Sequence, residues 1–278
     1  MPRVMHILVT RPEPDASEMR AQLMAQGHTA DIAPLLDITI TAPSEQSLAG
    51  ISALVVTSRN GLRALELATG LPRLLHLPLL VVGRGTGAAA RAMGFTDVTV
   101  GPATAKDLVP LIISAWRDKI LPARSAPDAV LPGPVLHVAG DKISFDLIPP
   151  LAKADVPLER ITVYSSAPAT ALPEEVERCI ARRGYDGVLL MSPLSAQTYI
   201  RLVADAGLAA AARDAAYLCL SKGIADILAA LGGSRILIAA KPNVEEMVVL
   251  IRNLAAQSAS LSSPGVENDN IDGTNNKV

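Results

Sequence analysis

Aromatic residues are scarce in this chain, since Phe, Trp and Tyr make up only 3% of its 278 residues. This scarcity argues against a protein that stacks the bases of single-stranded nucleic acid on aromatic side chains. Positive charge is not in excess either, because 25 Lys and Arg stand against 27 Asp and Glu. We therefore expect no nucleic-acid partner and no electrostatic attachment to a membrane surface.

Cysteine is nearly absent. Cys179 and Cys219 are far apart and form no CxxC motif, which favours a reducing compartment. No apolar run approaches the ~18–20 residues of a membrane-spanning helix. The apolar stretch near the N-terminus is broken by Arg11 and Pro12 and is too short for a signal peptide. These features predict a globular cytoplasmic protein without a membrane partner.

Motifs for metal binding or nucleophilic catalysis are missing as well. The histidines show no HxxxH or HExxH spacing, and the GxSxG motif of many hydrolases is absent. His6 and His137 fall in or beside predicted strands, which fits core or edge positions better than metal ligands. The sequence therefore predicts no metal site at its four isolated histidines, His6, His28, His76 and His137.

What the chain does have is aliphatic residues, since half of it is hydrophobic. Short aliphatic runs such as residues 53–58, 79–83 and 187–192 alternate with segments of helical periodicity. Unbroken aliphatic strands between helices are typical of parallel βα units that are covered on both faces. The fold class predicted from this pattern is α/β.

An internal repeat makes the prediction more specific. Residues 79–94 match residues 217–232, residues 100–112 match 238–251, and the motif LVVTSRNG at 54–61 matches VLLMSPLS. Three consecutive strand–helix units therefore occur twice in the same order, which predicts two similar α/β lobes with parallel sheets.

The division between the lobes is open from composition alone. The Pro- and Ala-rich segment 121–134 has the composition of a linker. Residues 37–41 and 160–164 instead alternate apolar and polar side chains, as the strands of an exposed ribbon joining two lobes would. The polar, aperiodic stretch 258–278 is expected to be a disordered tail.

A glycine-rich turn offers one candidate nucleotide site. Gly83, Gly85, Gly87 and Ala88 fit the pattern GxGxxA between a strand and a helix, which suits a bound pyrophosphate. The next strand ends in Val100 without an acidic residue that could hold a ribose. A nucleotide-dependent α/β enzyme that uses the Gly83–Gly87 turn is thus one alternative, and a tight turn or a site for another anion is the other.

Polar turns recur at the predicted carboxyl ends of the strands, where ligands of open α/β sheets bind. Helix N-termini there offer free N–H groups to anions, and two such lobes facing each other would suit a large polyanion. A protein with such a site could be an enzyme or a two-lobed anion-binding module. The serines in these turns also suit a purely structural role as helix N-caps. The candidate substrate-binding residues in these turns are Arg11, Ser58, Arg59, Arg84, Thr86, Gly140, Lys142, Ser192, Ser195, Ser221 and Lys222.

The ordered series of turns resembles the uroporphyrinogen-III synthase family. The resemblance covers roughly residues 4–255 and is carried by a set of short motifs, which are LVTRP (8–12), PLLDITI (34–40), VVTSRNGLRAL (55–65), VVGRGTGAAA (81–90), LHVAG (136–140), ITVYSS (161–166), MSPLSA (191–196) and LSKGIAD (220–226).

This resemblance implies a definite chain path through two flavodoxin-like lobes joined by a two-stranded β linker. The 121–134 segment then becomes a loop inside the second lobe. The implied boundaries are 1–37 with 170–256 for the first lobe, 44–160 for the second, 38–43 and 161–169 for the linker strands, and 257–278 for the tail.

The resemblance also implies a reaction in tetrapyrrole (haem, chlorophyll and cobalamin) biosynthesis. The linear tetrapyrrole hydroxymethylbilane, which carries eight carboxylates, loses water and closes to uroporphyrinogen III with ring D inverted. That reaction makes the enzyme a hydro-lyase that needs no cofactor, and we expect it to act as a monomer on this small-molecule substrate.

Individual roles are carried over by position. Tyr164 of ITVYSS resembles the family tyrosine that assists loss of the hydroxyl, and a phenol can act there as a general acid. Thr86 matches a threonine whose hydroxyl could bind a carboxylate or merely cap its helix. The chain departs from the family where Ser221 and Lys222 stand in place of a threonine-bearing turn.

Overall fold

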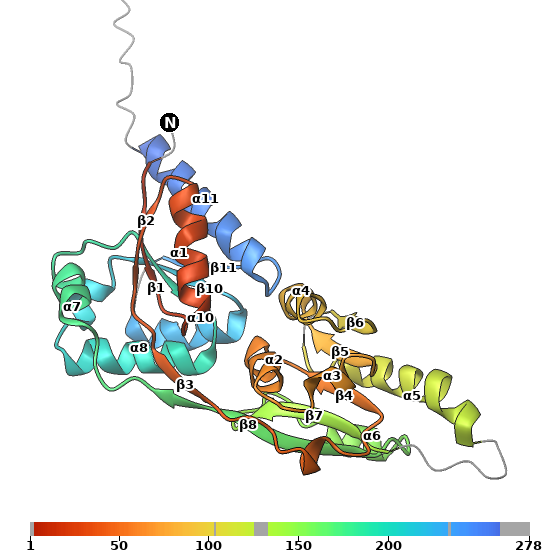
Figure 1. The fold of residues 1–278 in the computed structure, drawn as a ribbon. Helices are drawn as coiled ribbons and strands as arrows, with labels where there is room; N and C mark the ends of the chain where they lie inside the picture. The colour runs from red at the N-terminus through yellow and green to blue at the C-terminus, as the bar shows by residue number, and fades with distance from the viewer. Residues whose placement is uncertain (1–2, 103, 125–132, 233–234, 262–278) are drawn as a thin grey trace, which may run out of the picture. The chain divides into compact units, whose positions relative to one another are not determined.

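The computed structural model describes residues 3–102, 104–124, 133–232 and 235–261. The chain divides into two compact units, unit 1 (Met1–Pro34 and Ala171–Val278) and unit 2 (Leu35–Thr170). The chain therefore starts in unit 1, builds unit 2 and returns to complete unit 1 (Figure 1). Among the described residues, no helix is long and apolar enough to cross a bilayer.

Unit 1 is built on a five-stranded, fully parallel sheet. Its central strands are aliphatic runs whose residues are buried from both sides, which is why they lack the alternation of a half-exposed strand. The strand order is β11 (Ile236–Ile238), β10 (Ala216–Cys219), β9 (Gly187–Leu190), β1 (His6–Val9) and β2 (Thr29–Ile32).

Helices cover both faces of this sheet. On one face, α1 (Asp15–Ala25) and α11 (Val244–Leu261) pack apolar side chains against Ile7 and Leu218. On the other face, Tyr199 of α8 (Pro193–Asp205) meets Tyr217 of β10 edge-on at a ring separation of 5.9 Å. The remaining short elements of unit 1 are α7 (Glu174–Ala181), α9 (Ala209–Ala212), α10 (Lys222–Leu228) and the 3-10 turn η2 (Ala229–Leu231).

Unit 2 is built on a six-stranded sheet in which β3 pairs antiparallel to β8 and every other pairing is parallel. The two segments expected to link the lobes fall in β3 and β8, where Ile40 lies opposite Tyr164. The strand order is β3 (Leu36–Ile40), β8 (Leu158–Pro168), β7 (Val135–Gly140), β4 (Ala53–Val56), β5 (Leu79–Val82) and β6 (Val98–Gly101).

Two apolar cores lie on the two faces of the unit 2 sheet. In one core, Leu62 of α2 (Arg59–Glu66) and Ala90 of α4 (Arg84–Ala92) pack on Leu54. In the other, α5 (Leu108–Arg124) and α6 (Ile148–Ala152) pack on Val55. The short helix α3 (Leu71–Leu74) and the 3-10 turn η1 (Gln46–Leu48) complete the unit.

The predicted α/β fold with two mostly parallel sheets is confirmed. The repeated units occupy equivalent positions, because β4, β5 and β6 are consecutive neighbours in one sheet and β9, β10 and β11 in the other. Strands that the repeat does not contain complete each sheet. Unit 1 takes β1 and β2 from the start of the chain, whereas unit 2 takes β3, β7 and β8.

Two boundaries from the sequence need correction. Helix α5 runs to Arg124, so helix occupies the first four residues of the expected 121–134 loop. Helix α11 runs to Leu261, and Ser258 is buried, so the expected tail does not begin at 257. In α11, Ala and Ser near the end continue an existing helix at small cost even without large apolar residues to mark it. Residues 125–132 and 262–278 lie outside the described residues.

The turn before α4 requires glycine at one position. Gly83 has φ 77° and ψ 153°, a conformation that is essentially restricted to glycine. Gly85 lies two residues later inside the helix, and a Cβ there would meet no atom within 4 Å.

Because of this contrast, we expect substitution by alanine to change the free energy of unfolding differently at Gly83 and at Gly85. Gly83→Ala is expected to lower the free energy of unfolding by about 1–3 kcal/mol, because alanine is strained in that backbone conformation. Gly85→Ala is expected to leave it unchanged or to raise it by up to about 1 kcal/mol, because alanine is the better helix former. Urea unfolding of both variants measures the difference, and equal effects would contradict the strain at Gly83.

A second prediction concerns His137, which lies in the middle of β7 with 1% of its surface exposed. Its Nε2 has no hydrogen-bond partner among the described residues. Burial, helped by the positive charge of Arg160 and opposed by Asp146, lowers the pKa of His137 to about 4. The ordinary pKa of histidine is 6.5. Between that pH and about 4, His137 is therefore protonated in the unfolded chain and neutral in the folded chain.

Stability is therefore expected to fall as the pH drops from about 6.5 to 4, by about 3 kcal/mol from this residue at most. Urea unfolding at a series of pH values measures this slope. His137→Leu should flatten it, whereas substitution of the exposed His76 by Gln should not. An unchanged slope in His137→Leu would show that His137 is protonated in the folded state.

Candidate functional site

In unit 2 the predicted polar turns gather at one edge of the sheet. Because β4, β5 and β7 are neighbouring parallel strands, their carboxyl ends meet there. β8 also runs parallel to β7, and Tyr164 lies opposite Gly140, the last residue of β7. The fold thus brings the turns that follow three strands and the predicted catalytic tyrosine to the same edge.

Ser58 begins helix α2 and has two roles at this edge. Its hydroxyl oxygen accepts a hydrogen bond from the backbone N–H of Asn60 at 3.2 Å, which makes it the N-cap of the helix. The same hydroxyl lowers the pKa of the Tyr164 phenol through a side-chain hydrogen bond. A hydroxyl can accept one hydrogen bond and donate another, so the cap directs the proton of Ser58 towards Tyr164.

The ring of Tyr164 rests directly on Gly140. A Cβ on Gly140 would lie 2.9 Å from the phenolic oxygen of Tyr164 and collide with the ring carbons. The register of β7 and β8 shifts between Ala139 and Gly140, which allows this close approach. The absence of a side chain at Gly140 therefore allows the ring of Tyr164 to pack against it, a role that could not be predicted from its position in a polar turn.

Three groups set the electrostatics of the Tyr164 phenol. Burial raises its pKa above the ordinary value, and the nearby carboxylate of Asp141 raises it further. Hydrogen bonds from the Ser58 hydroxyl and the Gly140 backbone act in the opposite direction. The phenol is consequently protonated at neutral pH, and the two hydrogen bonds favour its ionised form.

Asp141 ties β7 to β8 beside the tyrosine. Its backbone N–H donates to the carbonyl of Tyr164 at 3.0 Å, and its Oδ1 accepts from the N–H of Ser166 at 3.1 Å. The predicted residue Lys142 is exposed and lies 3.6 Å from Asp141 Oδ2. Asp141 belongs to a polar turn in the sequence, but only the strand pairing reveals that it adjoins Tyr164.

The glycine-rich turn at the start of α4 lies at the same edge. Thr86 is buried in the first turn of the helix, and no side chain caps that turn among the described residues. Arg84 is exposed, whereas Arg59 at the start of α2 is half-buried. Gly87 packs against Val100, where a Cβ would approach to 2.5 Å, so this glycine serves helix–strand contact.

The predicted residues of unit 1 have mostly local partners. Arg11 forms an ion pair with Asp15 at 2.7 Å, and both side chains are largely buried. Ser192 caps α8 by accepting from the N–H of Ser195 at 3.0 Å, and the two hydroxyls lie 2.7 Å apart. These contacts stabilise the first turns of α1 and α8 at the carboxyl edge of the unit 1 sheet.

The turn at Ser221 and Lys222, which departs from the family pattern, also has only local contacts. Ser221 precedes α10, but its side chain makes no capping hydrogen bond. Lys222 pairs with Asp226 at 2.6 Å on an exposed surface. Exposed pairs of this kind contribute little stability, so Lys222 can exchange its partner for another anion.

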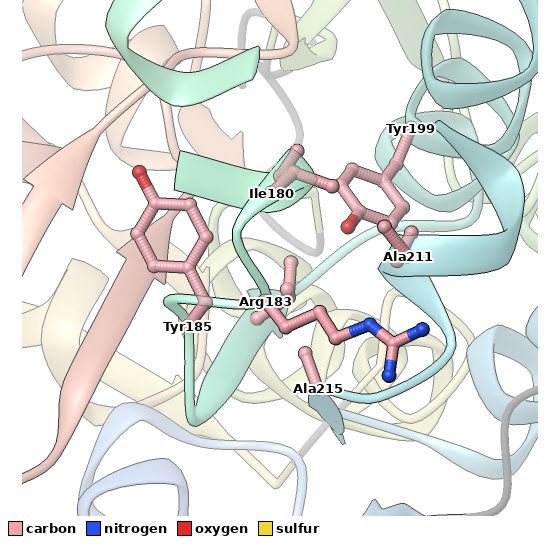
Figure 2. A pocket seen from close by; sticks show the side chains of 8 residues that line it. Ile180, Arg183, Tyr185, Tyr199, Ala211 and Ala215 are labelled. Atoms are coloured by element: carbon pink, nitrogen blue, oxygen red, sulfur yellow. The ribbon is translucent and has the colours of Figure 1, made fainter. Parts of the chain in front are cut away.

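A separate hollow in unit 1 lies between α8, α9 and the start of β9. Figure 2 shows Tyr199 and Ala211 on one side of it and Ile180 and Arg183 on another. Its cavity volume is only about 10 Å³, far below the ~300–1,000 Å³ of typical small-molecule sites. It is too small for a large polyanion.

Comparison with known proteins identifies related folds. The chain matches the family model described as uroporphyrinogen-III synthase HemD over residues 17–249. It resembles the solved uroporphyrinogen-III synthetase of Helicobacter pylori with a TM-score of 0.56 at 15% identity, covering 90% of this chain and 100% of that one. A mutant uroporphyrinogen III synthase of Thermus thermophilus gives a TM-score of 0.53 at 17% identity, with 92% and 100% covered. No curated protein sequence matches the chain significantly.

The double role of Ser58 gives a testable prediction. Ser58→Ala is expected to lower the free energy of unfolding by about 1 kcal/mol through loss of the N-cap, and to raise the pKa of Tyr164 through loss of its hydrogen bond. Ser192→Ala removes the equivalent N-cap of α8 in unit 1. It should lower the free energy of unfolding by a similar amount without changing the titration of Tyr164. Urea unfolding and ultraviolet titration of the tyrosines measure both effects, and identical titration curves would refute the contact.

Proposed function

Because this chain belongs to the uroporphyrinogen-III synthase family, we propose that it closes hydroxymethylbilane to uroporphyrinogen III with loss of water and inversion of ring D. The family acts in tetrapyrrole biosynthesis. The observation that carries the residue-level proposal is the seating of a protonated tyrosine on Gly140, beside the Ser58 hydroxyl and the start of α2.

Tyr164 is the general acid of the proposed mechanism. Its phenol donates a proton to the departing hydroxyl of the substrate, which leaves as water and generates an azafulvene. The Ser58 hydroxyl and the Gly140 backbone stabilise the phenolate at that moment. Ring D then attacks through a spiro intermediate before the macrocycle closes. The substrate releases a proton when its pyrrole rings become aromatic again, and the phenolate takes up that proton, so that only water leaves overall.

Positioning of the carboxylates is the second task. The N-termini of α2 and α4 in unit 2 and of α8 in unit 1 carry backbone N–H groups at the carboxyl ends of their sheets. Such groups bind carboxylates, and neighbouring cations strengthen the attraction. We assign carboxylate binding to these turns and to the turns after β7 and β10, through Ser58, Arg59, Arg84, Thr86, Lys142, Ser192, Ser195, Ser221 and Lys222, with Arg11 supporting the turn before α1.

The reaction class and cellular setting form part of the same proposal. Elimination of water makes the enzyme a hydro-lyase, and the chemistry above uses no cofactor. Two buried free thiols, Cys179 and Cys219, support a reducing, cytoplasmic location. We propose that the enzyme acts as a monomer, since each unit has its own apolar core.

The direct test supplies hydroxymethylbilane to the purified chain and separates the uroporphyrinogen isomers. Formation of the type III isomer in proportion to enzyme concentration supports the proposal. Formation of the spontaneous type I isomer alone, by a chain shown to be folded, would overturn it.

Tyr164→Phe is expected to slow turnover by about 10²-fold, the low end for loss of a general acid, because the hydroxyl also leaves unaided. The product should remain type III, since positioning is shared among many backbone groups. Initial rates and isomer analysis measure the two effects. Tyr199→Phe, which removes a hydroxyl buried in unit 1, is the control and should keep the full rate. Loss of all type III product in folded Tyr164→Phe would refute shared positioning.

A further inference from the structure

The amino-terminal edge of the unit 1 sheet gathers side chains that the sequence had shown as isolated. His6 is the first residue of β1, Asp31 lies in β2, and Cys179 lies on α7. One potential ligand atom from each lies within 4.8 Å of the other two. This cluster is at the opposite strand ends from the turns of unit 1 described above, and the proposed reaction does not use it.

Hydrogen bonds determine which nitrogen of His6 is free. Nδ1 lies 3.1 Å from the carbonyl oxygen of Gly184, which can only accept, so Nδ1 carries the hydrogen. Nε2 then presents its lone pair to Asp31 Oδ2 at 3.1 Å. A carboxylate oxygen is also an acceptor, so in this tautomer a metal ion between the two atoms would bind both of them.

Neighbouring groups hold the two ligands in place. The Tyr185 hydroxyl donates to Asp31 Oδ2 at 2.7 Å, and its ring packs 4.7 Å from the ring of His6. Figure 2 shows this hydroxyl pointing away from Tyr199, and therefore away from the nearby hollow. Partners of this kind orient metal-binding imidazoles and carboxylates in known sites.

We propose that His6, Asp31 and Cys179 bind a divalent transition-metal ion of the zinc class. Imidazole, carboxylate and thiolate are the ligands that zinc takes in four-coordinate sites, and a thiolate disfavours magnesium and calcium. The thiol of Cys179 loses its proton to solvent as the metal–sulfur bond forms. One possible ligand atom from each of the three residues lies within 4.8 Å of the other two, so the three groups must move inward to close around an ion with bonds of about 2.0–2.3 Å.

Such an ion would join the two chain segments that make unit 1. His6 and Asp31 come from the first 34 residues, whereas Cys179 belongs to the segment that starts at Ala171. The ion would strengthen an existing link at this edge, where Arg3 pairs with Asp186 at 2.9 Å. Its role is structural, and it stands independently of the proposed function.

The test uses the full-length chain with zinc and with cobalt as a spectroscopic substitute. One zinc ion per chain should bind in competition with a colorimetric chelator, and the cobalt form should show a thiolate-to-cobalt charge-transfer band. Cys179→Ser should abolish the band and weaken zinc binding by at least about tenfold. Cys219→Ser, which alters the other buried cysteine, should retain both properties.

Zinc should also raise the thermal midpoint of the wild type and of Cys219→Ser but not of Cys179→Ser. Should Cys179→Ser fail to fold, Asp31→Asn at a partly exposed position must show the same weakened affinity. Absence of stoichiometric zinc binding by the wild type would mean that the cluster holds only a proton, and it would overturn the proposal. Survival of the charge-transfer band in Cys179→Ser would overturn it equally.

Discussion

The ladder between β1 and β9 is the constraint on which the architecture depends. It pairs Ile7, Leu8 and Val9 with residues 187–189, so the first strand of the chain becomes an inner strand of a sheet whose other half is made much later. These three side chains have no exposed surface, and their burial requires the partner strand. The chain must therefore return from unit 2 before unit 1 has a core, which explains why unit 1 is discontinuous.

The same logic of strand pairing builds the site in unit 2. Tyr164 and Gly140 are adjacent only because β8 runs parallel to β7, and Ser58 reaches the phenol only because β4 is the next strand. The tyrosine is thus held by three groups at the ends of two strands, β4 and β7, and each group has a second structural task. Ser58 caps a helix, Gly140 ends a strand, and Asp141 ties two strands together. Residues that already stabilise the helix and the strands therefore also fix the position of the Tyr164 ring.

The two units use equivalent turns differently. In unit 1, Arg11, Ser192 and Lys222 are engaged with neighbours three or four residues along the chain, so these contacts chiefly stabilise helix starts. In unit 2, the turns after β4 and β7 instead adjoin a titratable side chain from β8, Tyr164. The repeat therefore duplicates the scaffold of strand, turn and helix N-terminus, whereas Tyr164 lies on a strand outside the repeat.

The fold class, the repeat and the carboxyl-end turns were predictable from the sequence, because hydrophobic periodicity and turn chemistry are local properties. The choice of Tyr164 as the candidate general acid came from a family resemblance and not from any physical signal. The sequence could not show that Gly140 seats the tyrosine or that Asp141 adjoins it. The sequence likewise showed His6 as an isolated histidine, whereas in the structure it lies beside Asp31 and Cys179. These contacts follow from strand order and register, which bring together residues that no spacing in the chain connects.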